Sequence, residues 1–461
     1  MPAVETYGNE PVPAEARTGT WRDLAQLLVA FLLNPLMYVL GALAVTAGGL
    51  PLWWAVATLA LGQLVSYALL AVVSRLGVDY GLPGQVAMRA FLGYWGARLL
   101  SSSYRTIVAT YWFAAQAIAS ALGVQALLDA IADVRVGLVP TALVLAAVQV
   151  AIAVLGFDVL RYVTRVVLPV GLLFVGIILA LYFSSDDPAF ALGRVLRSPE
   201  QDFNWLGFAT FFTVAVGATF TFVTNICDFT RYTRSRRDAE LGLVIPSVLT
   251  TTVTTFIGGY AAVATGEGNP FVAAPALTGS AVLLALLLFS ILVQSTGVNV
   301  INAYTVGLSL LNTVPRLGRL AATALGGAAA IGLSALPETV TEAQRWIGHI
   351  SNVAFPLTGA ILAQYLVRMR QRLDVDDLYR PEGRYRFVAG VNVAAVAAVS
   401  IGVAVYYAVP HDWVKAAWGL GVGAVLQLVL GPLQERALGH EARRPLLRGA
   451  ARRRPAEQPE P

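Results

Sequence analysis

Long apolar stretches separated by short polar segments dominate the hydropathy pattern of the chain. Each stretch has about the 20 residues that a helix needs to cross a bilayer. Their Leu, Ala and Val residues run continuously instead of alternating with polar residues, as strands of a membrane barrel would. Twelve stretches predict twelve transmembrane helices, at residues 24–46, 52–74, 100–122, 137–156, 165–184, 206–226, 242–265, 277–304, 319–336, 346–367, 387–408 and 413–433. The first is too long for a signal peptide and lacks a small-residue cleavage site, so we expect it to be retained.

A polar loop divides the first ten predicted spans into two sets of five. Because five is odd, span six begins on the opposite side of the membrane from span one, and the two sets have opposite topology. This arrangement is typical of inverted-repeat secondary transporters. The predicted units are a cytoplasmic N-terminal tail 1–23, a first repeat 24–184, an outer loop 185–205, a second repeat 206–368, a cytoplasmic loop 369–386, helices eleven and twelve 387–433, and a basic cytoplasmic tail 434–461.

The composition agrees with a membrane protein. Of the 461 residues, 57% are apolar and only 13% are charged, against roughly 25% charged residues in soluble proteins. So little charge cannot cover several soluble cores, and so much apolar sequence excludes disorder. Cys227 is the single cysteine and has no internal partner for a disulfide. The chain is therefore predicted to be an all-α polytopic membrane protein.

The basic residues predict the orientation of the chain. Of the 32 Arg and Lys residues, 26 fall in segments predicted to lie inside, five outside, and Arg105 within span three. This asymmetry follows the positive-inside rule and places both termini in the cytoplasm of a cell (plasma) membrane protein. The net charge of +5 is explained by membrane flanks and anionic lipid, so we predict the lipid bilayer and no nucleic acid as a partner.

Two spans carry features that interrupt a helix. Span one contains Asn34-Pro35 near its middle, where the proline removes a helical hydrogen bond and disfavours helical geometry at Asn34. A polar amide beside a break at bilayer depth is a candidate site; the alternative is a kink with Asn34 bonded to a neighbouring helix. Span six has no central proline, only Gly217 and several Thr residues. These residues predict a weak point there but are also ordinary packing residues in membranes.

Span three places an aromatic ring and an amide on one helix face. Trp112 and Gln116 are four residues apart, so they share a face on which a flat ring could stack and be hydrogen-bonded at its edge. About eleven residues of the span precede Trp112, so it lies near the middle of the bilayer. This depth favours a ligand role over a place in the interfacial aromatic belt.

Span eight is unusually polar for a buried helix, and such residues tend to face the bundle interior or a transport pathway. Ser295 and Thr296 supply neutral oxygens that suit a hard cation such as sodium. Asn299 and Asn302 are three residues apart and can face the same cavity. Hydrogen bonding between helices is the alternative for each of them.

Motifs for other chemistry are absent from the sequence. There is no phosphate-binding loop of an ATP-driven transporter and no Gly-x-Ser-x-Gly or His-Glu-x-x-His motif of a hydrolase. The three histidines, at positions 349, 411 and 440, form no metal-ligand spacing. We therefore predict neither an enzyme nor a cofactor.

Four stretches resemble the nucleobase–cation symporter family, which includes purine–cytosine, uracil, allantoin and hydantoin permeases. The resemblance covers nearly the whole chain, and the stretches occur in the family's order. They are Pro11-Val-Pro-x-x-x-Arg17; Gly81-Leu-Pro83 through Arg89-Ala-Phe-Leu-Gly93-x-x-Gly96 and on to Gln116; Asn225-Ile-Cys-Asp228-Phe-Thr-Arg231-Tyr232; and Asp377-Leu-Tyr-x-Pro-x-Gly383-x-Tyr385 with Gly390-Val-Asn392.

The resemblance implies a leucine-transporter type of 5+5 inverted repeat plus two C-terminal helices, and uptake of a flat heterocycle with sodium or protons. It implies that Trp112 stacks on the substrate and that Gln116 and Asn34 lie beside it. It places the cation at backbone carbonyls of Ala30 and Leu33 and at Ser295 and Thr296. The family's span-six aromatic aligns on Thr219, with Phe220 next to it. Asn299 and Asn302 cannot both lie in the family's register with Ser295-Thr296.

The resulting prediction is a secondary active importer of a nucleobase or related heterocycle that works by cation symport and alternating access. Trp112 and Phe220 would sandwich the ring, while Asn34, Gln116 and either Asn299 or Asn302 would read its edge. A transporter of the same fold for a vitamin or an amino acid is the main alternative. A membrane receptor or enzyme is a further one, for which we find no catalytic constellation and no appended domain. No obligate protein partner is inferred.

Overall fold

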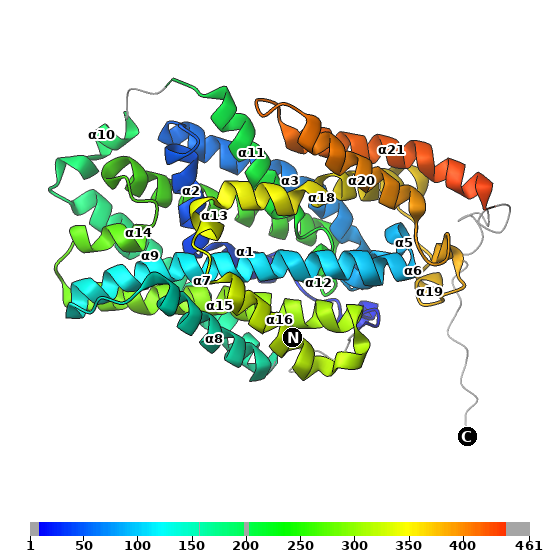
Figure 1. Cartoon of the computed structure of the whole chain (residues 1–461), viewed down its shortest axis with the longest axis horizontal. Coiled ribbons are helices and arrows are strands. Elements are labelled where there is room, and N and C mark those ends of the chain that lie inside the picture. The colour runs from blue at the N-terminus through cyan, green and yellow to red at the C-terminus, as the bar shows by residue number, and fades with distance from the viewer. Residues whose placement is uncertain (1–8, 156, 198–201, 439–461) are drawn as a thin grey trace.

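The computed structural model describes residues 9–155, 157–197 and 202–438, and within these it is helical, with two isolated bridges and no strand. The long helices run roughly along the longest axis of the molecule as one bundle (Figure 1). Most of the predicted basic tail lies outside the described residues. The all-α prediction is confirmed for the part of the chain that is described.

Every predicted span has a helical counterpart. In the first set these are α1 Trp21–Leu32 with α2 Pro35–Thr46, α3 Leu52–Tyr80, α7 Ser102–Ala132, α8 Leu138–Leu155 and α9 Phe157–Ser184. In the second set they are α11 Trp205–Phe220 with α12 Ile226–Thr230, α13 Arg236–Thr265, α15 Ala281–Thr313, α16 Gly318–Leu333 and α18 Ala343–Ala363, and the last two are α20 Val393–Ala408 and α21 Lys415–Ala437. Short helices connect them: α4 Gly84–Ala87, α5 Arg89–Leu92, α6 Tyr94–Gly96, α10 Leu192–Leu196, α14 Pro270–Ala273, α17 Glu338–Thr341 and α19 Val375–Leu378.

The lengths of the helices agree with a polytopic membrane protein. Among the described residues, 7 helices are long and apolar enough to cross a membrane, or 8 if the bent pair α1 and α2 is one span. The four shorter apolar helices, of 10–17 residues, are Leu138–Val154, Trp205–Phe220, Gly318–Leu333 and Val393–Ala408. The count of twelve spans stays a prediction.

The packing of the helices follows a reciprocal pattern. Helix α3 packs extensively against α13, and α7 against α15, so each is paired with its counterpart five spans later. In the same way α1 and α2 pack on α13, while α11 and α12 pack on α3. This is the pattern expected of two five-helix repeats related by a two-fold axis. Helices α20 and α21 lie outside it, along one edge beside α18 (Figure 1).

One close helix contact depends on a glycine and positions the second half of span one. A Cβ atom added at Gly258 of α13 would lie 1.8 Å from the carbonyl oxygen of Tyr38 in α2. Only a residue without a side chain allows two backbones to approach in this way, as is common where helices pack in membranes. Helix α2 therefore packs closely against α13 at this point.

Candidate functional site

Span one is broken at the predicted position. Helix α1 ends at Leu32, α2 begins at Pro35, and the two are bent by 66°. The Asn34 side chain bonds both sides of the break: its Oδ1 accepts from the Met37 amide at 3.1 Å, and its Nδ2 donates to the Phe31 carbonyl at 2.8 Å. Asn34 is therefore the N-cap of α2. Its observed hydrogen bonds join residues of its own span and not a neighbouring helix.

The break also leaves two carbonyl groups without their helical donors. In a continuous helix, the amides of Asn34 and Met37 would reach the carbonyl oxygens of Ala30 and Leu33. Here the Asn34 amide donates to Leu32 O at 3.0 Å, and the Met37 amide donates to Asn34. Carbonyl groups freed in this way at a helix break are available to a ligand.

Span six is broken as well, but beyond the predicted weak point. Helix α11 ends at Phe220 and α12 begins at Ile226, with turns and no proline between them. Gly217 lies within α11, where an added Cβ would meet the Ser351 side chain at 2.6 Å. The glycine therefore serves helix packing, which was the alternative reading, and the break follows at residues 221–225.

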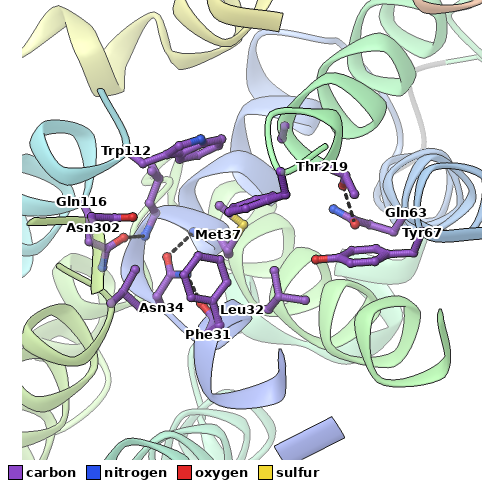
Figure 2. Close-up of a pocket in the computed structure, with 14 residues that line it drawn as sticks. Phe31, Leu32, Asn34, Met37, Gln63, Tyr67, Trp112, Gln116, Thr219 and Asn302 are labelled. Carbon is purple, nitrogen blue, oxygen red and sulfur yellow. Dashed lines mark hydrogen bonds between the residues drawn. The ribbon is translucent and has the colours of Figure 1, made fainter. Parts of the chain in front are cut away.

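A cavity of about 30 Å³ lies between the two breaks. It is lined by Phe31, Leu32, Asn34, Leu36 and Met37 of span one, Gln63 and Tyr67 of α3, Trp112 and Gln116 of α7, Ala218, Thr219 and Phe222 of span six, and Val298 and Asn302 of α15 (Figure 2). None of these lining residues carries a charge. Within the described residues no three His, Cys, Asp or Glu side chains are placed to hold a metal ion. The pocket is a neutral site with amide, hydroxyl and aromatic groups.

The wall formed by α7 contains the two residues predicted from span three. The Trp112 indole donates to Thr221 Oγ1 at 3.2 Å, which fixes the ring to the span-six break. Gln116 Oε1 accepts from the Leu36 amide at 3.4 Å. Gln116 Nε2 has no partner among the described residues, although the side chain is only 1% exposed. A buried amide donor without a partner is costly, so Gln116 presents a vacant N–H at the pocket.

The ring contributed by span six differs from the prediction. Phe220 is fully buried in an apolar cluster, where its ring lies edge to face with that of Phe355 at a centroid distance of 6.2 Å, and it does not line the pocket. Because α11 ends at Phe220, the next turn brings Phe222 to the pocket instead. The Phe222 ring lies edge to face with that of Phe31 at 5.5 Å. Thr219, the other predicted residue, does line the pocket.

The two asparagines of α15 occupy different layers. Asn302 lines the pocket, and its Nδ2 donates to Asn299 Oδ1 at 3.4 Å. Asn299 lies behind it, fully buried, and donates to Phe113 O at 3.0 Å and to Gln149 Oε1 at 2.8 Å. Asn299 therefore supports Asn302 from the interhelical layer. Of the two asparagines, Asn302 is the one that reaches the pocket.

The residues predicted for a cation are buried or half-buried. Ala30 and Leu33 are buried at the end of α1 and just beyond it, and Thr296 is half-buried. Ser295 is fully buried, and its Oγ accepts from Gln149 Nε2 at 3.3 Å. Gln149 of α8 thus bonds both Ser295 and Asn299.

Among the polar and aromatic pocket residues, the sequence reasoning missed four, namely Phe31, Gln63, Tyr67 and Phe222. Gln63 is the single amide in the apolar stretch of span two, so the rule that polar residues at membrane depth face a pathway would have found it. The aromatic residues give no such signal, because rings in apolar helices are usually packing residues.

A second cavity, of about 610 Å³, lies near the other ends of α2 and α7 beside α14 and α17. It faces the outside in the predicted topology. Leu36 lines the central pocket and Val39 lines the second cavity, and both belong to one packed apolar cluster that includes Ile118 and Ile347. Packed side chains therefore fill the space along α2 between the two cavities.

In each comparison with known sequences, this chain is similar to permeases. The sequence profile of permeases for cytosine/purines, uracil, thiamine and allantoin matches residues 11–430. The hydantoin permease of Microbacterium maritypicum is 25% identical over 78% of this chain and 75% of its own. The allantoin permease of Bacillus subtilis (strain 168) is 24% identical over 89% of each chain.

Solved structures share the fold. The inward-facing conformation of Mhp1 superposes with a TM-score of 0.81 at 20% identity, over 93% of each chain. A Na⁺-coupled sialic acid symporter superposes with a TM-score of 0.58 at 13% identity, over 91% of each chain. The predicted all-α polytopic architecture is thus confirmed.

Proposed function

The chain belongs to the family of permeases for cytosine/purines, uracil, thiamine and allantoin, and from this membership we propose that it imports a nucleobase or related heterocycle by cation symport. It is a membrane transporter and not an enzyme. The relatives it resembles include a hydantoin permease, a purine-uracil permease and an allantoin permease. The cargo in these names contains a polar heterocyclic ring, and the groups that line the central pocket suit such a ring.

One observation carries the proposal: the vacant Nε2 of Gln116 lies at the pocket one helical turn from Trp112. A planar ring stacked on the indole would receive a hydrogen bond at its edge from this amide. Base–aromatic stacking contributes about 1–3 kcal/mol per ring. A charged substrate would find no countercharge in the lining, and burying an unpaired charge is strongly unfavourable. The pocket therefore favours a neutral ring.

The other pocket residues take supporting roles in this proposal. Phe222 replaces Phe220 as the second aromatic residue at the ring. Asn302 presents its amide from α15, backed by Asn299. Asn34 uses one N–H and one oxygen lone pair in its hydrogen bonds to Phe31 and Met37 at the helix break. Its second N–H and second lone pair are left for the substrate.

The coupling cation is proposed to lie at the carbonyl oxygens of Ala30 and Leu33 and the hydroxyls of Ser295 and Thr296. Neutral oxygens of this kind suit a hard cation. None of the four groups titrates near neutral pH, so the set favours sodium over a proton. Gln149 bonds Ser295 on one side and Asn299 on the other, which connects this set to the pocket.

The size of the cavity bears on the mechanism. A volume of about 30 Å³ holds a water molecule and not a heterocycle. The substrate therefore requires the broken spans and the α7 and α15 pair to move apart. Such motion is expected of alternating access between inverted repeats. We propose that the protein works in the plasma membrane with both termini in the cytoplasm.

The decisive experiment is uptake by the full chain in proteoliposomes. A panel of labelled cytosine, uracil, hydantoin and allantoin is measured with an inward sodium gradient, with a proton gradient, and with neither. We expect uptake of at least one ring, stimulated by the sodium gradient. In Trp112→Ala, uptake should fall at least tenfold because the stacking surface is lost.

The control carries the same change at Trp418, a tryptophan 44% exposed on α21, where uptake should persist. Undiminished uptake by Trp112→Ala would overturn the proposed site. Uptake of a labelled amino acid or vitamin, with no uptake of any of the four rings, would instead favour the alternative transporter.

A further inference from the structure

The pocket has a polar wall that faces the predicted one. Gln63 and Tyr67 are four residues apart on α3 and both line the cavity. Figure 2 shows them on the opposite side of the pocket from Trp112 and Gln116. Both side chains are at most 5% exposed. A substrate held by α7 would therefore meet a second set of hydrogen-bonding groups.

The Gln63 amide is hydrogen-bonded to the end of α11. Thr219, on α11 just before the span-six break, donates from its hydroxyl to Gln63 Oε1 at 2.8 Å. The Gln63 nitrogen then points away from Thr219 toward the pocket (Figure 2). It makes no hydrogen bond to the described part of the chain. The Tyr67 hydroxyl likewise points into the pocket and has no described partner.

Two vacant amide donors thus face the cavity from opposite walls. Gln116 lines the cavity, its Oε1 accepts from the Leu36 amide, and its Nε2 has no partner among the described residues. Gln63 Oε1 is occupied by Thr219, so its nitrogen is directed at the cavity. Donors on both sides match a ligand with acceptors at two separate edges, because each donor left without a partner in a dry site costs affinity.

We propose that Gln63 is a specificity-determining residue, which selects rings with carbonyl groups at two edges over rings that carry an exocyclic amino group. Uracil, hydantoin and xanthine belong to the first class, and cytosine and adenine to the second. An amino group placed at Gln63 Nε2 would set donor against donor. Tyr67, whose hydroxyl both donates and accepts, adjusts to either edge, so Gln63 makes the distinction. This inference rests on the proposed function.

The test is competition for uptake by unlabelled uracil and cytosine in wild type and in two variants of the full chain. Wild type should bind uracil more tightly than cytosine. Gln63→Leu removes the donor, and uracil should lose about tenfold in affinity while cytosine changes little. Gln63→Glu replaces the donor with an acceptor, and the preference should move toward cytosine. Gln125→Leu, the same change at the second cavity, should leave the preference unaltered.

The outcomes separate this inference from the proposed function. If Trp112→Ala abolishes uptake while both Gln63 variants keep the wild-type preference, the role of Gln63 is refuted and the transporter assignment stands. If no ring is transported by wild type, the proposed function fails first. Should Gln63→Leu fail to fold, Thr219→Val provides a second route. This change removes the hydrogen bond from Thr219 to the Gln63 amide and should reduce the preference for uracil over cytosine. An unchanged preference would again refute the inference.

Discussion

The helix breaks in spans one and six are stabilised in different ways. In span one the break is made locally, because Asn34 bonds backbone groups on both sides of it and Pro35 begins the next helix. In span six no proline is present, and the buried Thr224 Oγ1 and Asn225 Oδ1 have no partner within the described chain. The first break is therefore encoded by two adjacent residues, whereas the second depends on what surrounds it.

The surroundings of the second break come from α3 and from the segment that follows it. The Gly84 amide donates to Asp228 Oδ1 at 2.7 Å, and the Thr230 hydroxyl donates to Ser74 O at 3.1 Å. A Cβ at Gly84 would lie 2.4 Å from Thr224 O and 2.7 Å from Asn225 Cα. Both obstacles are backbone atoms, which cannot yield as a flexible side chain does. The backbone of residues 224–225 therefore packs directly against Gly84.

Gly84→Val is expected to have the largest effect of the changes that test this difference. Its side chain would push the unwound segment away and cost about 3 kcal/mol or more, as overpacking of a tight contact does. We expect little folded protein and no uptake. Yield of monodisperse protein and the melting temperature measure this directly.

The matched control is Gly176→Val in α9, where nothing lies within 4 Å of an added Cβ. It should fold and transport like wild type. If Gly84→Val were equally well tolerated, the second break would have to be held by its own residues, and the contrast between the two spans would disappear.

Asn34→Ala should have a smaller effect on stability. It removes the N-cap of α2 and the bond to Phe31, and loss of such a cap costs about 0.5–2 kcal/mol. Asn34→Ser retains an oxygen for capping and should recover most of the melting temperature. Uptake should be reduced in both variants, since neither keeps the amide at the pocket. A melting temperature lower in Asn34→Ala than in Gly84→Val would reverse the predicted order.

The same contrast explains what the sequence could predict. Asn34-Pro35 combines a cap with a residue that breaks helices, so the position of the first break was predicted and observed. The second break carries no such pair, and Gly217 was chosen although it packs inside α11 against Ser351. The residues that hold this break, such as Gly84, are more than 100 positions away. Local sequence therefore contains no signal for it.

In the pocket, too, local sequence predicts only part of the site. Trp112 and Gln116 were found because one helix places both on one face. Phe222 was missed because its direction depends on where α11 unwinds, and the prediction fell on Phe220 instead. Gln63 faces Trp112 only after α3 and α7 are packed around the two breaks. The helices and one wall of the pocket follow from periodicity, whereas the opposite wall requires the tertiary arrangement.

Pro35→Ala should have the smallest effect and separates the two causes of the first break. Proline occupies the first position of α2, where its missing N–H is not needed. A continuous helix would require Asn34 to leave its extended backbone (φ −149°, ψ 156°) and give up both of its side-chain bonds. Pro35→Ala alone should therefore change stability by less than about 1 kcal/mol and keep uptake within about twofold. The double variant Asn34→Ala/Pro35→Ala removes cap and proline together and should lose uptake, because nothing local then opposes a continuous helix. Loss of uptake in Pro35→Ala alone would show that the proline, and not the asparagine cap, maintains the break.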